Sequence, residues 1–140
     1  MSDLARLARK ISRCLGVEVV LTTDYEAKTP LIVATVDDRE QSGNTFRVAL
    51  GPPSKREDNL RRTHELVYHS RAKEKHRQQG GKCAHCGKAL GNLGECDHIN
   101  PRGRFGRDDQ MPNLQIVCPP FSGGCDFHQL KHGQGQRRTA

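Results

Sequence analysis

The sequence is poor in aromatic residues and has no long apolar run. None of its 140 residues is Trp, only two are Tyr and four are Phe, and apolar residues make up 34%. A core with so few large side chains often depends on a bound metal or on disulfides. No stretch approaches the roughly 18 consecutive apolar residues of a membrane-spanning helix, so we expect no membrane partner. The start of the chain also lacks the apolar segment of a secretory signal, which predicts a cytoplasmic protein with reduced cysteines.

The net charge of +7 lies entirely in the second part of the chain. Residues 1–54 carry seven basic and seven acidic side chains, whereas residues 55–140 carry sixteen basic and nine acidic ones. All seven histidines also belong to the second part. An excess of this kind favours a polyanionic partner such as a nucleic acid.

The spacing of apolar residues predicts an α+β protein. Apolar side chains at helical intervals predict an N-terminal helix near residues 3–15 that Gly16 ends. Alternating or continuous apolar runs then predict one small sheet, with strands near residues 17–21, 31–36 and 46–50. Residues 1–53 contain no chemical motif and suit a scaffold, a dimerisation surface or a substrate-reading element equally well.

A second, basic helix is predicted over residues 54–80. Gly51-Pro52-Pro53 marks its start, Ser54 and Glu57 fit a capping box, and Gly80-Gly81 stops it. Its apolar residues are sparse, and its basic residues include Arg61, Arg62, Arg71, Lys73, Lys75 and Arg77. Two interpretations are open: a solvated helix with one narrow packed stripe, or a helix that lies along a phosphate backbone.

Two pairs of cysteines indicate a metal site. They flank about thirty residues and consist of Cys83, Cys86, Cys118 and Cys125. Four thiolates bind Zn²⁺ tetrahedrally, and such closed sites are structural because they leave no position open for a substrate. The alternative is a set of buried or redox-active cysteines. The other two cysteines, Cys14 and Cys96, are predicted to pack as small apolar residues.

Further polar residues lie between and after these cysteines in a characteristic order. Asp97-His98 comes first, Asn113 follows before Cys118, and His128 then precedes Lys131 at His-x-x-Lys spacing. This order resembles the zinc-stapled branch of the HNH endonucleases, which have the ββα-metal fold. The resemblance covers roughly residues 80–132. It implies a strand that ends at Asp97-His98, a second strand after Asn113, and a helix that closes over both.

The resemblance also implies a role for each of these residues. His98 corresponds to the general base and Asn113 to the residue that orients the loop, while Asp97 and His128 correspond to ligands of Mg²⁺ or another divalent ion. The implied reaction cleaves a phosphodiester to a 5′-phosphate and a 3′-hydroxyl. General chemistry agrees, because a neutral imidazole can accept a proton from water and a divalent ion can neutralise a phosphate.

Two features of the sequence leave alternatives open. Asp126 directly follows Cys125, where the family carries its metal-binding residue, so Asp126 is an alternative ligand and His128 would then join the zinc site. A set of basic residues is predicted to contact DNA, namely Arg102, Arg104, Arg107 and Lys131. The alternative for the three arginines is a solvated loop that Asp108 and Asp109 partly balance.

The sequence therefore predicts an HNH endonuclease that acts on DNA, with RNA the less favoured substrate. Its parts are an α+β segment (1–53), a basic helix (54–80), a nuclease motif (81–133) and a disordered tail (134–140). The main alternative is a non-catalytic zinc module that binds nucleic acid, and a third is an adaptor whose residues 1–54 bind a partner. Small proteins of this kind resemble restriction, phage or mobile-element nucleases, and a homodimer would supply two active sites for a double-strand break.

Overall fold

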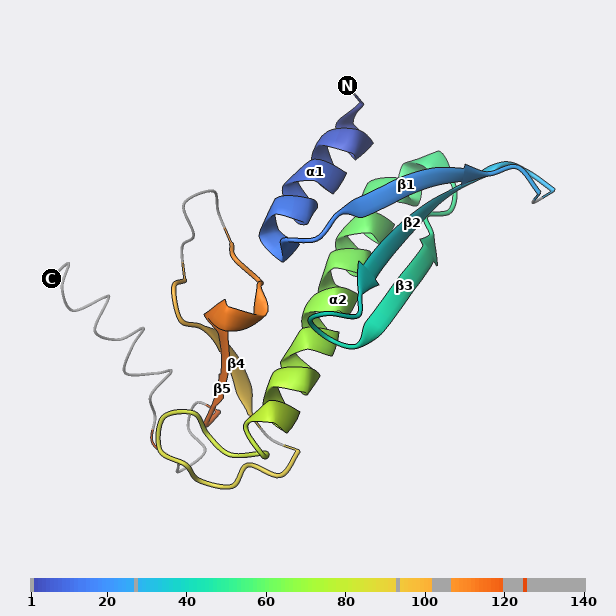
Figure 1. The fold of residues 1–140 in the computed structure, drawn as a ribbon. Helices are drawn as coiled ribbons and strands as arrows, with labels where there is room; N and C mark the ends of the chain where they lie inside the picture. Colours follow the sequence, from blue (N-terminus) through green and yellow to red (C-terminus); the bar gives the residue numbers. More distant parts are fainter. Residues whose placement is uncertain (1, 27, 93, 102–106, 120–124, 126–140) are drawn as a thin grey trace, which may run out of the picture.

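The computed structural model describes residues 2–26, 28–92, 94–101, 107–119 and 125. It confirms the α+β class, with two α-helices and two small antiparallel sheets in this part of the chain (Figure 1). The helices and strands are α1 (Asp3–Leu15), β1 (Val19–Asp24), β2 (Leu31–Asp38), β3 (Asn44–Ala49), α2 (Arg56–Gln78), β4 (Glu95–His98) and β5 (Leu114–Val117). Within the same residues, no helix combines the length and the apolarity needed to cross a membrane.

The N-terminal unit consists of α1 and a three-stranded sheet in the order β1-β2-β3, as the apolar spacing predicts. Ser2 begins α1 by accepting a hydrogen bond from the Ala5 amide. Gly16 ends it with a φ of 69°, a left-handed conformation that glycine adopts at little cost. The buried face of α1 includes Leu15, which joins the core with Val36 from the sheet.

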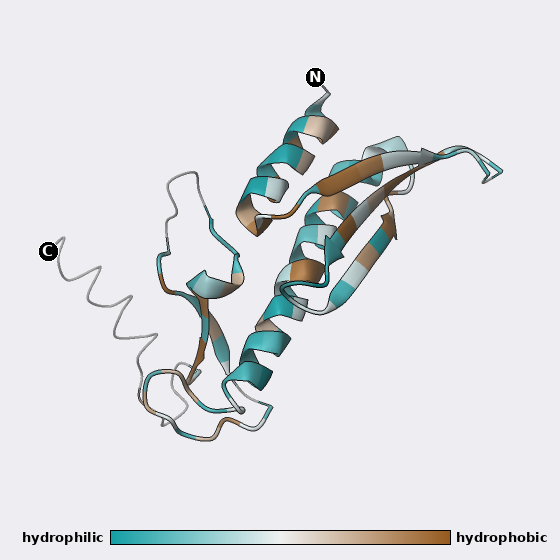
Figure 2. Cartoon of the chain, in the orientation of Figure 1, coloured by the Kyte–Doolittle hydropathy of each residue, from teal (hydrophilic) through white to brown (hydrophobic). Residues whose placement is uncertain are grey.

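The long helix α2 belongs to two parts of the molecule. Its first half adds Leu60 and Val67 to the core of the N-terminal unit, and its second half contacts β5. Figure 2 shows this division, because brown apolar segments on α2 lie beside the sheet while its end near the hairpin is teal. A helix with a short apolar stripe in one half and polar residues in the other fits such a bridging position.

The start of α2 differs from the prediction, and its end agrees with it. The capping box is wrong: Pro53–Lys55 form a 3-10 turn, and Lys55 precedes the helix without any side-chain cap. The Lys55 amide instead donates to the Pro52 carbonyl at 2.8 Å, within the 3-10 turn. At the other end, Gly80 and Gly81 adopt positive φ angles of 66° and 70°, and the helix stops before them.

Arg71 contradicts the prediction that the basic side chains of this helix face solvent or phosphate. Its side chain is fully buried and binds both carboxylate oxygens of Asp38, with Nη2–Oδ1 and Nε–Oδ2 distances of 2.6 and 3.1 Å. Its Nη1 donates to the carbonyl oxygens of Leu15 (2.7 Å) and Asp109 (2.8 Å). One side chain of α2 therefore ties together α1, β2 and the segment that precedes β5.

The β4–β5 hairpin is the part of the predicted ββα motif that the described residues contain. Its antiparallel register pairs Asp97 with Gln115 and His98 with Leu114, so β4 ends at the Asp-His pair as predicted. The side-chain amide of Gln79 pairs with the backbone of Ile116 in both directions. Its Oε1 accepts from the Ile116 amide and its Nε2 donates to the Ile116 carbonyl, each at 2.9 Å. The C-terminal end of α2 is thereby fixed to β5.

Candidate functional site

The four predicted cysteines meet in one cluster. The sulfur atoms of Cys83, Cys86, Cys118 and Cys125 all lie within 4.8 Å of one another. Two pairs are closer: Cys83 and Cys125 are separated by 3.7 Å, and Cys86 and Cys118 by 3.6 Å. Metal–sulfur bonds of about 2.3 Å in a tetrahedron require sulfur pairs about 3.8 Å apart. The cluster therefore fits a single tetrahedral ion.

The backbone around Cys83 favours the thiolate that such an ion requires. Burial alone would raise the pKa of Cys83, but hydrogen bonds from the backbone of Cys86, His85 and Cys118 lower it to about 6. The amides of His85 and Cys86 point at its sulfur from 3.4 and 3.5 Å. This is the arrangement of a two-residue cysteine knuckle, in which the turn itself supplies donors to the first sulfur.

The structure does not place Asp97 and His98 on one face of the hairpin. Successive side chains of a strand point to opposite faces. Asp97 is buried, and its Oδ2 accepts a hydrogen bond from Gln115 Nε2 at 2.9 Å. His98 points instead toward α2, where its ring stacks on that of Tyr68 with a centroid distance of 5.6 Å and an interplanar angle of 4°.

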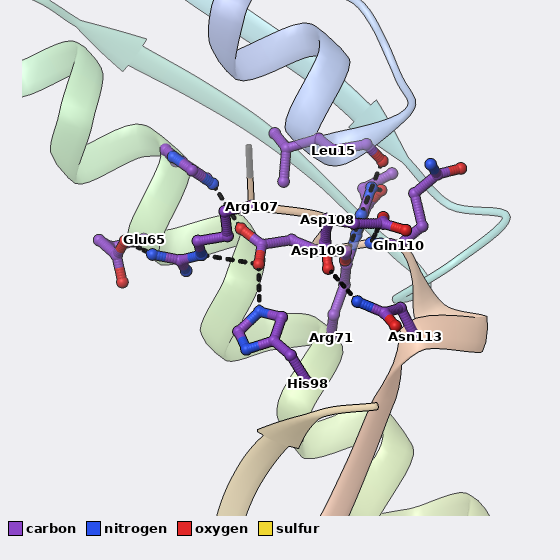
Figure 3. A network of polar contacts seen from close by, with 11 residues as sticks. Leu15, Glu65, Arg71, His98, Arg107, Asp108, Asp109, Gln110 and Asn113 are labelled. Atoms are coloured by element: carbon purple, nitrogen blue, oxygen red, sulfur yellow. Dashed lines mark hydrogen bonds and ion pairs between the residues drawn. The ribbon is translucent and has the colours of Figure 1, made fainter. Parts of the chain in front are cut away.

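A buried carboxylate organises the surroundings of His98. Asp109 Oδ1 accepts hydrogen bonds from His98 Nε2 (2.6 Å) and Arg107 Nε (2.7 Å), as Figure 3 shows. Its Oδ2 bonds to Nε2 of His64, a residue of α2, at 2.6 Å. Burial alone would raise the pKa of Asp109, but the bonds from His64, Arg107 and His98 outweigh that effect and lower the pKa to about 2. Asp109 is therefore ionised throughout the physiological pH range.

Arg107 and Tyr68 complete the enclosure of this carboxylate. The Arg107 guanidinium lies over the Tyr68 ring, 4.5 Å from its centroid, and also bonds to Glu65 at 3.1 Å. Burial raises the pKa of Tyr68, so its hydroxyl stays protonated. Arg107 was predicted to contact DNA; the structure shows it bound to two carboxylates of the protein, and its contact with DNA stays a prediction.

Asn113 holds together the two ends of the loop that joins β4 to β5. Its Oδ1 accepts from the Asn100 amide at 2.8 Å. Its Nδ2 donates to the carbonyls of Asn100 (3.1 Å) and Asp108 (2.8 Å). An amide side chain suits this position because it can accept and donate at the same time. This geometry is compatible with the loop-orienting role that the resemblance implies.

Replacing Asn113 with alanine is expected to free the Asn100 amide selectively. A hydrogen bond of this kind contributes about 0.5–1.5 kcal/mol, so the Asn100 amide should exchange with solvent up to about tenfold faster. The neighbouring Ile99 amide provides an internal control, because it bonds to the Asn113 backbone carbonyl at 2.8 Å and keeps that bond in the variant. Hydrogen exchange followed by NMR measures both. Equal acceleration at Ile99 and Asn100 would contradict the prediction.

Several predicted residues lie outside the described part of the chain. They are Arg102, Arg104, Asp126, His128, Lys131 and the tail 134–140. Among the described residues, the four cysteines are the only group of three or more Cys, His, Asp or Glu side chains arranged so that they could hold one metal ion.

Sequence reasoning missed Asp109, which bonds to His98, and His64, which bonds to the other carboxylate oxygen of Asp109. Asp109 was interpreted as a balancing charge in a solvated loop, and it is fully buried. His64 was counted only as one of seven histidines. The one available signal was a histidine on the same helix as a sparse apolar stripe, and it does not reveal a partner 45 residues away.

No protein-family model matches the chain, and neither the curated proteins nor the solved structures that were compared with it gave a match.

Proposed function

We propose that this protein is a metal-dependent endonuclease of the HNH class that cleaves DNA. The observation that carries the proposal is the state of His98. It ends a hairpin strand directly after an aspartate, and its Nε2 is hydrogen-bonded to an ionised, buried carboxylate at 2.6 Å. A histidine held by a carboxylate is the common arrangement of a general base in hydrolytic enzymes.

The roles of the chain's own residues follow from these contacts. An ionised carboxylate only accepts hydrogen bonds, so Asp109 selects the His98 tautomer with its proton on Nε2. Nδ1 is then the nitrogen that would take a proton from the attacking water. Asn113 keeps the loop after β4 in place beside this ring. A divalent ion on Asp97 and on His128 or Asp126 would neutralise charge on the scissile phosphate.

The cysteine cluster would hold a structural Zn²⁺ ion in this protein. Its four sulfurs leave no coordination position for a substrate, so its contribution is to the fold of the hairpin. The apolar core around it is small, comprising Cys83, Leu90, Ile116, Val117 and Cys118. A core of this size is insufficient without a staple.

The charge of this part of the chain suits the phosphate backbone of the DNA substrate that we propose. Residues 55–140 carry the whole net charge of +7. Exposed basic side chains on α2 include Arg61, Arg62 and Lys73. Contacts of this kind give affinity without sequence recognition and make binding sensitive to salt.

A non-catalytic zinc module that binds nucleic acid is the second candidate. The opposite orientations of Asp97 and His98 favour it, because successive side chains of a strand point to opposite faces and not toward one phosphate. It would use the same cysteine cluster and the same basic surface. It gives no reason for a buried carboxylate with three hydrogen-bonded partners, and for that reason we rank it second.

Replacing His98 with alanine is expected to lower plasmid nicking by about 100-fold to 10,000-fold, the usual contribution of a general base. Binding to DNA should stay within a factor of about two, since the basic side chains that contact the backbone are unchanged. Nicking of supercoiled plasmid with Mg²⁺, Mn²⁺ or Ni²⁺ measures the first effect, and fluorescence anisotropy measures the second.

Two controls separate the candidates. His69→Ala removes an exposed histidine of α2 and should nick at the wild-type rate. Omitting the added divalent ion, with zinc retained, should abolish nicking reversibly. Salt-sensitive DNA binding without nicking under any ion would favour the zinc module instead.

A further inference from the structure

We propose that His64 and Asp109 are positioning residues for His98, and that α1 and α2 form the frame that holds them. This inference rests on the proposed function, because it explains the orientation of the proposed general base. The N-terminal unit then supports the active site, although this unit contributes no residue to the HNH motif.

Asp109 determines which ring nitrogens of His98 and His64 carry a proton. Asp109 has two carboxylate oxygens, and each receives an imidazole: His98 on Oδ1 and His64 on Oδ2, both at 2.6 Å. Because an ionised carboxylate has no proton to donate, both imidazoles must donate from Nε2. The arrangement therefore fixes one tautomer of His98, with Nδ1 as the nitrogen that carries the lone pair.

Contacts with α1 and α2 hold Asp109 in place. Its backbone amide donates to the Cys14 carbonyl of α1 at 2.9 Å, and its backbone carbonyl accepts from Arg71 of α2 at 2.8 Å. Its side chain is completely enclosed. The carboxylate thus takes its place from elements that precede the hairpin in the chain, and the hairpin alone would not provide it.

His64 makes its own contribution to the orientation of the Asp109 carboxylate. The His64 ring donates a hydrogen bond to Asp109 Oδ2. Loss of that bond would leave this buried oxygen without its donor from α2. Without that bond the carboxylate could turn to bind Arg107 with both oxygens, a geometry that guanidinium groups favour. His98 would then lose the acceptor that selects its tautomer. The Tyr68 ring, whose centroid lies 5.6 Å from that of His98, would still restrict the plane of the His98 ring. It would not determine which nitrogen of His98 carries the proton.

The test is the ¹⁵N spectrum of the histidine side chains in the full-length, zinc-loaded protein at pH 8. Protonated and unprotonated ring nitrogens have well-separated ¹⁵N frequencies, and the His98 signals are identified by their loss in His98→Gln. We expect His98 with its proton on Nε2 in the wild type. His64→Leu and Asp109→Asn should both introduce the Nδ1-protonated form, and His64→Gln, which keeps a donor, should restore most of the wild-type spectrum. His69→Leu, an exposed site on the same helix, should leave the spectrum unchanged.

Nicking kinetics provide the second readout. In His64→Leu and Asp109→Asn, kcat should fall about 10-fold to 100-fold, as for other groups that orient a functional histidine, with KM for plasmid nearly unchanged. A wild-type His98 protonated on Nδ1, or a tautomer unaffected by either variant, would overturn the inference. If the tautomer responds as expected but the wild type never nicks DNA, the proposed function fails and the positioning of His98 stands. The wild-type spectrum decides the tautomer even if a variant fails to fold.

Discussion

Removing the metal ion from the cysteine cluster is expected to unfold the β4–β5 hairpin and leave the N-terminal unit folded. The hairpin has two strands of four residues and a core of five buried residues, so little apolar burial stabilises it. Structural zinc ions contribute an apparent free energy of about 10–16 kcal/mol in small domains. The core formed by α1, the three-stranded sheet and the first half of α2 contains no cluster cysteine.

Amide exchange measured before and after chelation tests this expectation. Protection should disappear from β5, for example at Ile116, and persist in β2, for example at Val36. Cys118→Ser should reproduce the effect and lose bound zinc. Cys96→Ser replaces a cysteine of the same hairpin outside the cluster and should keep one zinc per chain. Retained protection of Ile116 without metal would show that the hairpin folds unaided.

Replacing Arg71 with alanine is expected to lower the free energy of unfolding by about 3–5 kcal/mol, as for other buried ion pairs that lose one partner. Asp38 would remain as a completely buried charge without its guanidinium, and the carbonyls of Leu15 and Asp109 would lose a donor. Urea denaturation followed by circular dichroism measures this change.

Arg77 provides the matched control for this prediction. It lies on the same helix and forms an ion pair with Glu74, but its own side chain is 73% exposed and that of Glu74 is 21% exposed. Exposed pairs of this kind contribute little, so Arg77→Ala should leave the urea midpoint nearly unchanged. Similar effects of the two substitutions would contradict the interpretation of Arg71 as the buried connection between α1, β2 and the segment before β5.

The elements that could be predicted are those that local spacing determines. The periodicity of α1, its stop at Gly16 and the alternating or continuous apolar runs of the three strands each reflect near neighbours in the sequence. The cysteine cluster was predictable for a different reason. Two pairs of cysteines, the first at knuckle spacing, are typical of a metal site, so the sequence pattern predicts the contact although its two halves are more than thirty residues apart.

The buried polar contacts could not be predicted because composition describes a residue and not its partner. Arg71 resembles the surface arginines of α2 in every local respect, and only the fold places Asp38 against it. Asp109 likewise resembles Asp108 until α1 and α2 enclose it. Tertiary contacts of this kind fix both the stability of the protein and the orientation of His98.

The side-chain amide of Gln79 has a consequence for how the protein behaves at high concentration. A two-stranded sheet exposes the outer edge of each strand, and an exposed edge can recruit a strand from another molecule and begin aggregation. Gln79 occupies the amide and carbonyl of Ile116 on β5 much as the backbone of a third strand would. The residue that follows α2 therefore protects this edge of the short sheet from intermolecular pairing, together with the Ala84 amide, which also donates to the Ile116 carbonyl at 2.9 Å.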